Sequence, residues 1–164
     1  MERNNGSGES SGAPEFVEQV VDTDDNALVA FVDSSAIVAL VDAGDASHGA
    51  AEAAYTDLLD QGYKLFTTNH AVAETVELLA IGLGPDVARR WLRDHRLPVY
   101  HADEQDEHRA RTLVISSRSA RGLSFIDAVS LVVMERYSVA DAFAVDPDFL
   151  SETAWGLTNQ DRSR

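Results

Sequence analysis

The sequence predicts a three-layer α/β protein, with a mainly parallel central sheet of four or five strands flanked by helices. Short apolar runs alternate along the chain with longer amphipathic segments, which implies right-handed crossovers between parallel strands. The first run, residues 27–32, is apolar at every position, as in a strand buried on both faces. It stops at Asp33, directly before a helical pattern, and this places a carboxylate at the end of a buried strand where open α/β sheets bind ligands.

Further elements follow in order, with helix starts marked by capping residues and ends marked by glycine. Ser34 and Ser35 are candidate caps for the first helix, Thr68 and Asn69 for the third, and Pro85 begins the fourth. The predicted helices are 34–41, 47–61, 69–82, 86–96, 103–119 and 125–137, and the strands after the first are 63–67, 98–100 and 139–145. Residues 146–148 read as a turn, and Ser151–Leu157 as a short edge strand.

Length and composition set the class of protein. A chain of 164 residues is long enough for one domain with a substantial core. The absence of cysteine excludes disulfides, thiolate zinc sites and cysteine nucleophiles. Acidic residues or glycines break every apolar stretch before the ~20 residues that span a bilayer, and the N-terminus does not resemble a signal peptide. We therefore expect a cytoplasmic protein without membrane contact.

The formal net charge is −15, and Lys64 is the only lysine. Dispersed acidity with almost no lysine indicates a halophilic protein in a salt-rich cytoplasm, although an ordinary acidic protein would have a similar net charge. Charge alone argues against a nucleic-acid partner, but high salt would screen that repulsion.

The two ends of the chain differ in composition from its centre. Residues 1–26 hold seven acids and one arginine among Gly, Ser and Asn, and we predict a disordered acidic tail. The stretch GSGESSGAPEF would also suit an added linker. The predicted organisation is this tail, a domain over residues 27–157, and a polar C-terminal tail over 158–164.

Four acids lie in apolar segments or at element boundaries: Asp33, Glu74, Asp127 and Asp146. No basic residue flanks Asp33, Glu74 or Asp146 closely, and the basic residue nearest to Asp127 is Arg121. Buried acids need partners, and carboxylates without basic partners suit a hard cation such as Mg²⁺ or Mn²⁺. Such an ion can activate a water molecule for phosphodiester cleavage.

Each acid also has a structural explanation. Asp33 could cap the following helix, and Asp127 completes an S-x-x-D capping pattern with Ser124. Glu74 could be an exposed helix residue, and Asp146 before Pro147 a turn acid. The functional interpretation depends on the combination of the four.

The segments VDSSAIVAL, NHAVAETVELL, LSFIDAVSLVVMER and AFAVDPDF, in this order, resemble a PIN domain, most closely the VapC-type toxin ribonucleases. The resemblance covers about Leu28 to Leu157. It implies that Asp33, Glu74, Asp127 and Asp146 are the family's catalytic and metal-binding acids, acting on RNA with Mg²⁺ or Mn²⁺. Ser34 matches the family's frequent Ser or Thr after the first acid, whereas Ala144 stands where the family often has a hydroxyl. Asp148 is a possible fifth ligand.

The resemblance also implies a cognate antitoxin as partner and a homodimer, with an apolar face of the first two helices available for either contact. Three alternatives stay open: a non-catalytic PIN-like binding module, a housekeeping RNA-processing nuclease and, less well supported, a phosphoryl-receiving domain. The five histidines show no close metal-ligand spacing. Two groups of arginines, 89–96 and 109–121, would suit either RNA phosphates or surface ion pairs.

Overall fold

Four parallel strands form the central sheet of the structure, a computed structural model that describes residues 27–117 and 123–152. They are β1 (Val29–Val32), β2 (Lys64–Thr68), β3 (Val99–Tyr100) and β4 (Asp141–Phe143), in the spatial order β3-β2-β1-β4. Phe31 pairs with Phe66 of β2 on one side and with Ala142 of β4 on the other. The two central strands therefore end side by side, and the predicted parallel α/β sheet is confirmed.

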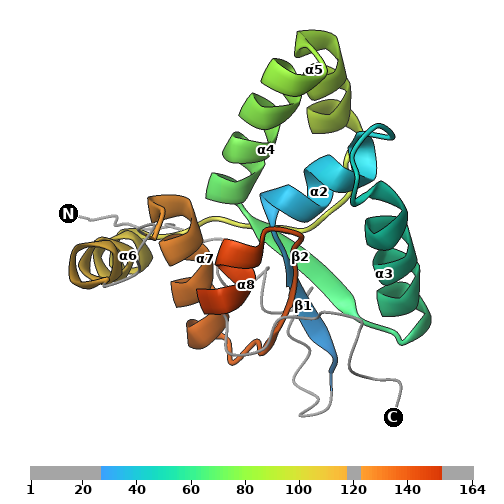
Figure 1. The fold of residues 1–164 in the computed structure, drawn as a ribbon. Coiled ribbons are helices and arrows are strands. Elements are labelled where there is room, and N and C mark those ends of the chain that lie inside the picture. The colour runs from blue at the N-terminus through green and yellow to red at the C-terminus, as the bar shows by residue number, and fades with distance from the viewer. Residues whose placement is uncertain (1–26, 118–122, 153–164) are drawn as a thin grey trace, which may run out of the picture.

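Within the described residues, seven helices connect and follow the strands (Figure 1). They are α2 (Ser34–Val41), α3 (His48–Asp60), α4 (Asn69–Gly82), α5 (Pro85–Asp94), α6 (Glu104–Ser116), α7 (Phe125–Arg136) and α8 (Pro147–Glu152). Predicted and observed bounds agree within a few residues. The predicted edge strand at Ser151–Leu157 is wrong where it can be compared, because Ser151 and Glu152 continue α8, and residues 153–157 lie outside the described part. The predicted turn at 146–148 is also wrong in part, because Pro147 and Asp148 already belong to α8.

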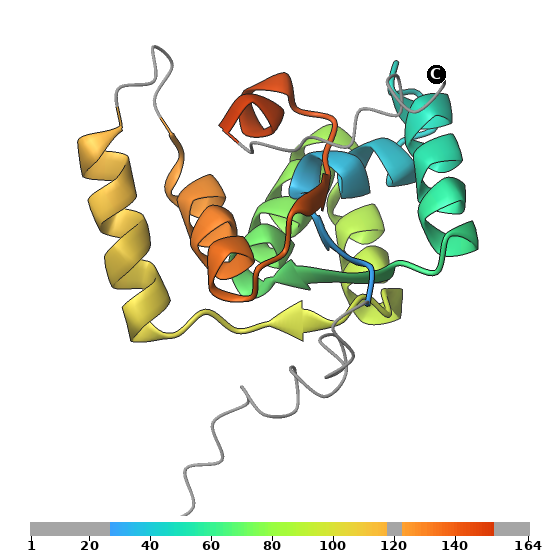
Figure 2. The same cartoon turned by 90° about the horizontal axis from the view of Figure 1, so that it is seen from below.

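The sheet separates two apolar cores because neighbouring strand residues point to opposite faces. Phe31 and Phe66 face one core, which α6, α7 and α8 cover. Ala30 and Val32 face the other core, formed with α2 and α3. Figure 2 shows α6 beside α7 on one side of the sheet and α3 on the other. The predicted three layers follow from this arrangement.

Two leucines of the flanking helices are largely exposed. Leu59 of α3 is 49% exposed and Leu92 of α5 is 47% exposed. α3 buries Ala51 and the neighbouring Leu58, whereas α5 buries only the small side chain of Ala88. The apolar stripe of each helix is therefore only partly covered by the rest of the described chain.

In the part of the chain that the structure describes, no helix has both the length and the apolar character required to cross a membrane.

Candidate active site

The four predicted acids come from separate elements that meet at the carboxyl edge of the sheet. Asp33 follows β1 and is the N-cap of α2. Glu74 lies in α4, which begins immediately after β2, and Asp146 lies between β4 and α8. Asp127 lies in the first turn of α7. Because parallel strands all end at the same edge, elements far apart in sequence deliver their acids to one region.

Asp33 is 3% exposed and holds one carboxylate oxygen in a hydrogen-bonded position. Its Oδ2 accepts from the backbone N–H of Ser35 at 2.9 Å and from the Ser35 hydroxyl at 2.5 Å. Its Oδ1 is buried and has no hydrogen-bond partner among the described residues. The predicted capping role is thus real, but it uses only one oxygen, and the other is a desolvated acceptor that requires a further explanation.

Glu74 is held by the residue after Asp33. The Ser34 hydroxyl donates to Glu74 Oε2 at 2.5 Å and so connects the first turn of α2 with α4. Ser34 is itself 4% exposed, whereas Glu74 is half-buried. The inward orientation of Glu74 contradicts the alternative of an exposed helix residue. Glu77, one turn later, is exposed.

Asp127 and Asp146 combine local structural roles with positions at the site. The backbone N–H of Asp127 donates to the Ser124 hydroxyl at 3.0 Å, so the predicted capping contact is present. Asp146 is exposed, and its Oδ1 accepts from the backbone N–H of Asp148 at 2.8 Å, at the start of α8. Asp148 is exposed in that first turn.

The carboxylates influence one another electrostatically. Burial raises the pKa of Asp33, and the charge of Asp146 raises it further. Burial also raises the pKa of Glu74, and repulsion from the charges of Asp33, Asp127 and Asp146 raises it further. The pKa of Asp127 is raised by burial and then by Asp33 and Asp146. The four acids therefore form one cluster of like charges, which is unfavourable at neutral pH without a counter-ion.

The donor atoms fit a hard divalent cation. Among the described residues, the cluster offers carboxylate oxygens with no basic partner between them, and Asp33 contributes a buried oxygen without a hydrogen bond. Within residues 27–117 and 123–152, no three His, Asp or Glu side chains are already gathered closely enough to hold an ion.

Ser35 is a residue of the site for which the sequence indicated only a helix cap. Its hydroxyl donates to Asp33 and accepts from the backbone N–H groups of Val145, at 3.0 Å, and Asp146, at 3.1 Å. One hydroxyl therefore joins the first acid to the chain that carries the last. It contacts the two residues that follow Ala144, the position where the family often has a hydroxyl. The signal that could have found it was the second serine of Asp33-Ser-Ser.

Other polar candidates have structural partners. His48 pairs with Glu52, His70 with Glu107, and His95 stacks on Trp91. Arg89, Arg93 and Arg109 pair with Asp86, Asp94 and Glu135 in exposed contacts, which favours the surface ion-pair interpretation of these arginines. Arg118 and Arg121 lie outside the described residues.

Comparison with known proteins agrees with this geometry. The PIN domain family matches residues 30–156. The chain is similar to the 23S rRNA-specific endonuclease VapC20 of Mycobacterium tuberculosis, in strains CDC 1551 / Oshkosh and ATCC 25618 / H37Rv. Both are 34% identical to it over 122 residues, which is 73% of this chain and 90% of each relative. The crystal structure of M. tuberculosis VapC20, described as a sarcin-ricin loop cleaving toxin, superposes with a TM-score of 0.66 at 31% identity. That match covers 77% of this chain and 95% of the solved one.

Proposed function

The chain belongs to the PIN-domain family, and from this membership we propose that it is a VapC-type toxin, an endoribonuclease that hydrolyses RNA phosphodiester bonds with a divalent cation. The observation that carries the proposal is the carboxylate cluster at the end of β1, with the buried Oδ1 of Asp33 that no described residue contacts through a hydrogen bond. Asp33, Glu74, Asp127 and Asp146 are the proposed catalytic and metal-holding residues.

The proposed cofactor is Mg²⁺ or Mn²⁺, because both ions prefer oxygen ligands. When bound, such an ion supplies a nucleophilic water at neutral pH and stabilises charge at the scissile phosphate. The chain's own residues orient the carboxylates. Ser34 fixes the direction of Glu74, and Ser35 fixes Asp33 relative to the backbone of Asp146. In the overall reaction, water forms one new P–O bond and one bridging P–O bond to ribose breaks.

The VapC20 relatives suggest which RNA to test first. Their name specifies 23S rRNA, and the solved VapC20 structure is that of a toxin that cleaves the sarcin-ricin loop. We propose a structured ribosomal RNA loop as the substrate of this chain as well. A housekeeping RNA-processing enzyme would instead prefer a precursor RNA.

The test is cleavage of ribosomal RNA at high KCl with Mg²⁺ or Mn²⁺, comparing the wild type with Asp127→Asn. Glu77→Gln is the matched control, because it removes an exposed acid one turn from Glu74 on the same helix. Metal-dependent cleavage that is lost in Asp127→Asn and kept in Glu77→Gln supports the proposal. A folded wild type that cleaves no RNA with either ion contradicts it and favours the non-catalytic binding module. Asp148→Asn tests the fifth acid in the same assay.

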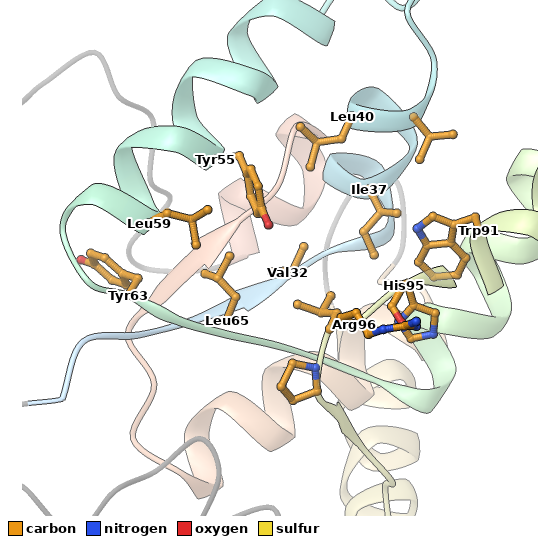
Figure 3. Close-up of a pocket in the computed structure, with 13 residues that line it drawn as sticks. Val32, Ile37, Leu40, Tyr55, Leu59, Tyr63, Leu65, Trp91, His95 and Arg96 are labelled. Atoms are coloured by element: carbon orange, nitrogen blue, oxygen red, sulfur yellow. The ribbon is translucent and has the colours of Figure 1, made fainter. Parts of the chain in front are cut away.

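We further propose that a cognate antitoxin binds a pocket on the face of the sheet that α2 and α3 cover (Figure 3). The pocket, of about 370 Å³, lies between α2, α3 and α5 and is lined mainly by apolar and aromatic side chains. Figure 3 shows Tyr55 and Leu59 on one wall and Trp91 on the other. Tyr55 is 38% exposed and Leu59 49% exposed, with Arg96 at the same pocket. This pattern suits an amphipathic antitoxin segment that carries an acidic residue.

The pocket would serve equally as the surface of a homodimer, which the family resemblance also implies.

The dispersed negative charge and single lysine support the proposal of a salt-rich cytoplasm as the working environment.

A further inference from the structure

An aromatic pair lies next to the carboxylate cluster. The rings of His70, in the first turn of α4, and Phe125, the first residue of α7, have centroids 5.7 Å apart and planes inclined at 78°. Phe125 is 37% exposed, which is uncommon for a phenylalanine in the described chain, where Phe31, Phe66, Phe143 and Phe149 are buried. The pair is not explained by the apolar cores.

The positions of the two rings along their helices place them beside the acids. His70 precedes Glu74 by four residues on α4, so both side chains lie on the same face of that helix. Phe125 is the first residue of α7, whose first turn also carries Asp127. α4 and α7 pack against each other, and the contact of the His70 and Phe125 rings joins their first turns. The aromatic pair therefore connects the same two helices on the side of their N-terminal ends.

His70 is held from a third helix. Its Nε2 lies 3.1 Å from Glu107 Oε1 of α6, and its side chain is 21% exposed, whereas that of Glu107 is 44% exposed. The imidazole is thus fixed between Glu107 and Phe125, and it supports the ring of Phe125 from one side. The exposed part of Phe125 remains available to a ligand.

We propose that the surface formed by Phe125 and His70 binds a nucleobase of the RNA next to the scissile phosphate. This inference rests on the proposed nuclease function, because it takes the carboxylate cluster as the site of the phosphate. A flat, apolar ring at the edge of an acidic site suits a nucleobase, which is flat and, unlike the phosphate, carries no negative charge. Bases that leave a loop or single strand stack on aromatic side chains in this way. Phe125 is the base-binding residue, and His70 is a positioning residue.

The test uses a short stem-loop RNA that spans a mapped cleavage site, and versions with an abasic ribose on either side of the cut. Phe125→Leu keeps apolar bulk but removes the π-face, and Phe125→Trp restores it. We expect Phe125→Leu to raise KM about tenfold with little change in kcat, in line with the usual effect of one stacked base. Ile81→Ala is the control, since Ile81 is a 77% exposed apolar residue of α4 that lines neither the cluster nor the pocket. It should leave KM unchanged.

The inference is decided by whether the effect of the abasic site on KM depends on the residue at position 125. If the surface binds a base, one abasic position raises the KM of the wild type and of Phe125→Trp about tenfold but has no further effect on Phe125→Leu. His70→Ala should weaken this coupling without lowering kcat. Independent, multiplying effects of the abasic site and of Phe125→Leu would overturn the inference, as would an unchanged KM in a folded Phe125→Leu variant.

A second readout separates this inference from the proposed nuclease function. In the background of Asp127→Asn, binding of a short oligoadenylate is measured without cleavage. An additional Phe125→Leu change should weaken that binding about tenfold. If the wild type does not cleave RNA, the nuclease proposal fails, and this binding comparison alone decides on the surface. Equal affinity with and without Phe125 would then overturn it.

Discussion

The Ser34 hydroxyl donates to Glu74 Oε2 at 2.5 Å, across 40 residues of sequence, and both groups lie at the carboxylate cluster. This bond fixes the carboxylate of α4 relative to the helix that begins at Asp33. Ser34 is therefore a positioning residue. Because serine is uncharged, its effect on kcat can be measured without changing the charge of the carboxylate cluster.

Ser34→Ala is expected to lower kcat about tenfold, because Glu74 loses a hydrogen bond to its charged carboxylate and with it a fixed orientation. The fold should be retained, since alanine fits a buried position of α2. Single-turnover RNA cleavage measures the effect. Ser130→Ala is the control, because it removes a buried hydroxyl that bonds only within α7 in the described contacts. A kcat reduced equally in both variants would contradict the positioning role.

Ser35→Ala is expected to lower the free energy of unfolding by ~1–3 kcal/mol, since the N–H groups of Val145 and Asp146 lose their acceptor and Asp33 loses a donor. Urea denaturation of the metal-free protein measures this loss. Ser35→Thr keeps the hydroxyl and should recover most of it. If the Ser35→Thr variant is as unstable as Ser35→Ala, the three hydrogen bonds of the Ser35 hydroxyl contribute little to stability. Helix propensity would then explain the loss of stability.

Asp33→Asn is expected to stabilise the metal-free protein at neutral pH, because it removes a buried charge while keeping an acceptor for Ser35. Burial raises the native pKa of Asp33 above its ordinary value of 3.8, so the native state binds more protons than the unfolded state between the two values. Wild-type stability therefore falls as pH rises through this window. The stability difference between variant and wild type should be largest at neutral pH and disappear on acidification.

The same variant tests the cation. Mn²⁺ should raise the unfolding temperature of the wild type, with ~3 kcal/mol of stabilisation at a hundredfold excess over Kd, and should have much less effect on Asp33→Asn. Glu77→Gln should respond to Mn²⁺ as the wild type does. Equal stabilisation of all three proteins by Mn²⁺ would mean that the ion binds elsewhere.

Arg136→Met is expected to cost ~3 kcal/mol, because Asp106 is 1% exposed and would lose its ion pair with Arg136 at 2.9 Å. The hydrogen bond from Arg136 also lowers the pKa of Asp103. This contribution is therefore present above the unfolded pKa of Asp103 and is lost as pH falls through its lower native pKa. Thermal unfolding from neutral to acidic pH should show a steeper acid loss for the wild type than for the variant. Parallel curves would contradict the assignment.

Leu59→Asp is expected to weaken inhibition by the cognate antitoxin at least about tenfold, because it places a charge in the apolar pocket. RNA cleavage by the free protein should not change. Ile81→Asp is the matched control, as Ile81 is 77% exposed on α4 and does not line the pocket. If the antitoxin inhibits both variants like the wild type, another surface binds it. A change in oligomeric state with Leu59→Asp alone would indicate the homodimer interface.

The sequence by itself determined the alternation of strands and helices and the placement of acids at their boundaries. Both follow from local signals: apolar runs, capping residues such as Thr68 and Ser124, and glycines at helix ends. Asp33 and Glu74 could be selected because a charge in an apolar stretch is costly without a partner. Parallel strands then required these acids to share an edge.

Only the tertiary structure decided which groups hold these acids. Ser34 reaches Glu74 across 40 residues and Ser35 reaches the backbone of Asp146 across 111, and no periodicity along the chain encodes such pairs. The contact of His70 with Phe125 and the exposure of Leu59 likewise depend on which helices pack together. Local propensity acts over a few residues, whereas these contacts are set by the joint packing of helices on the sheet.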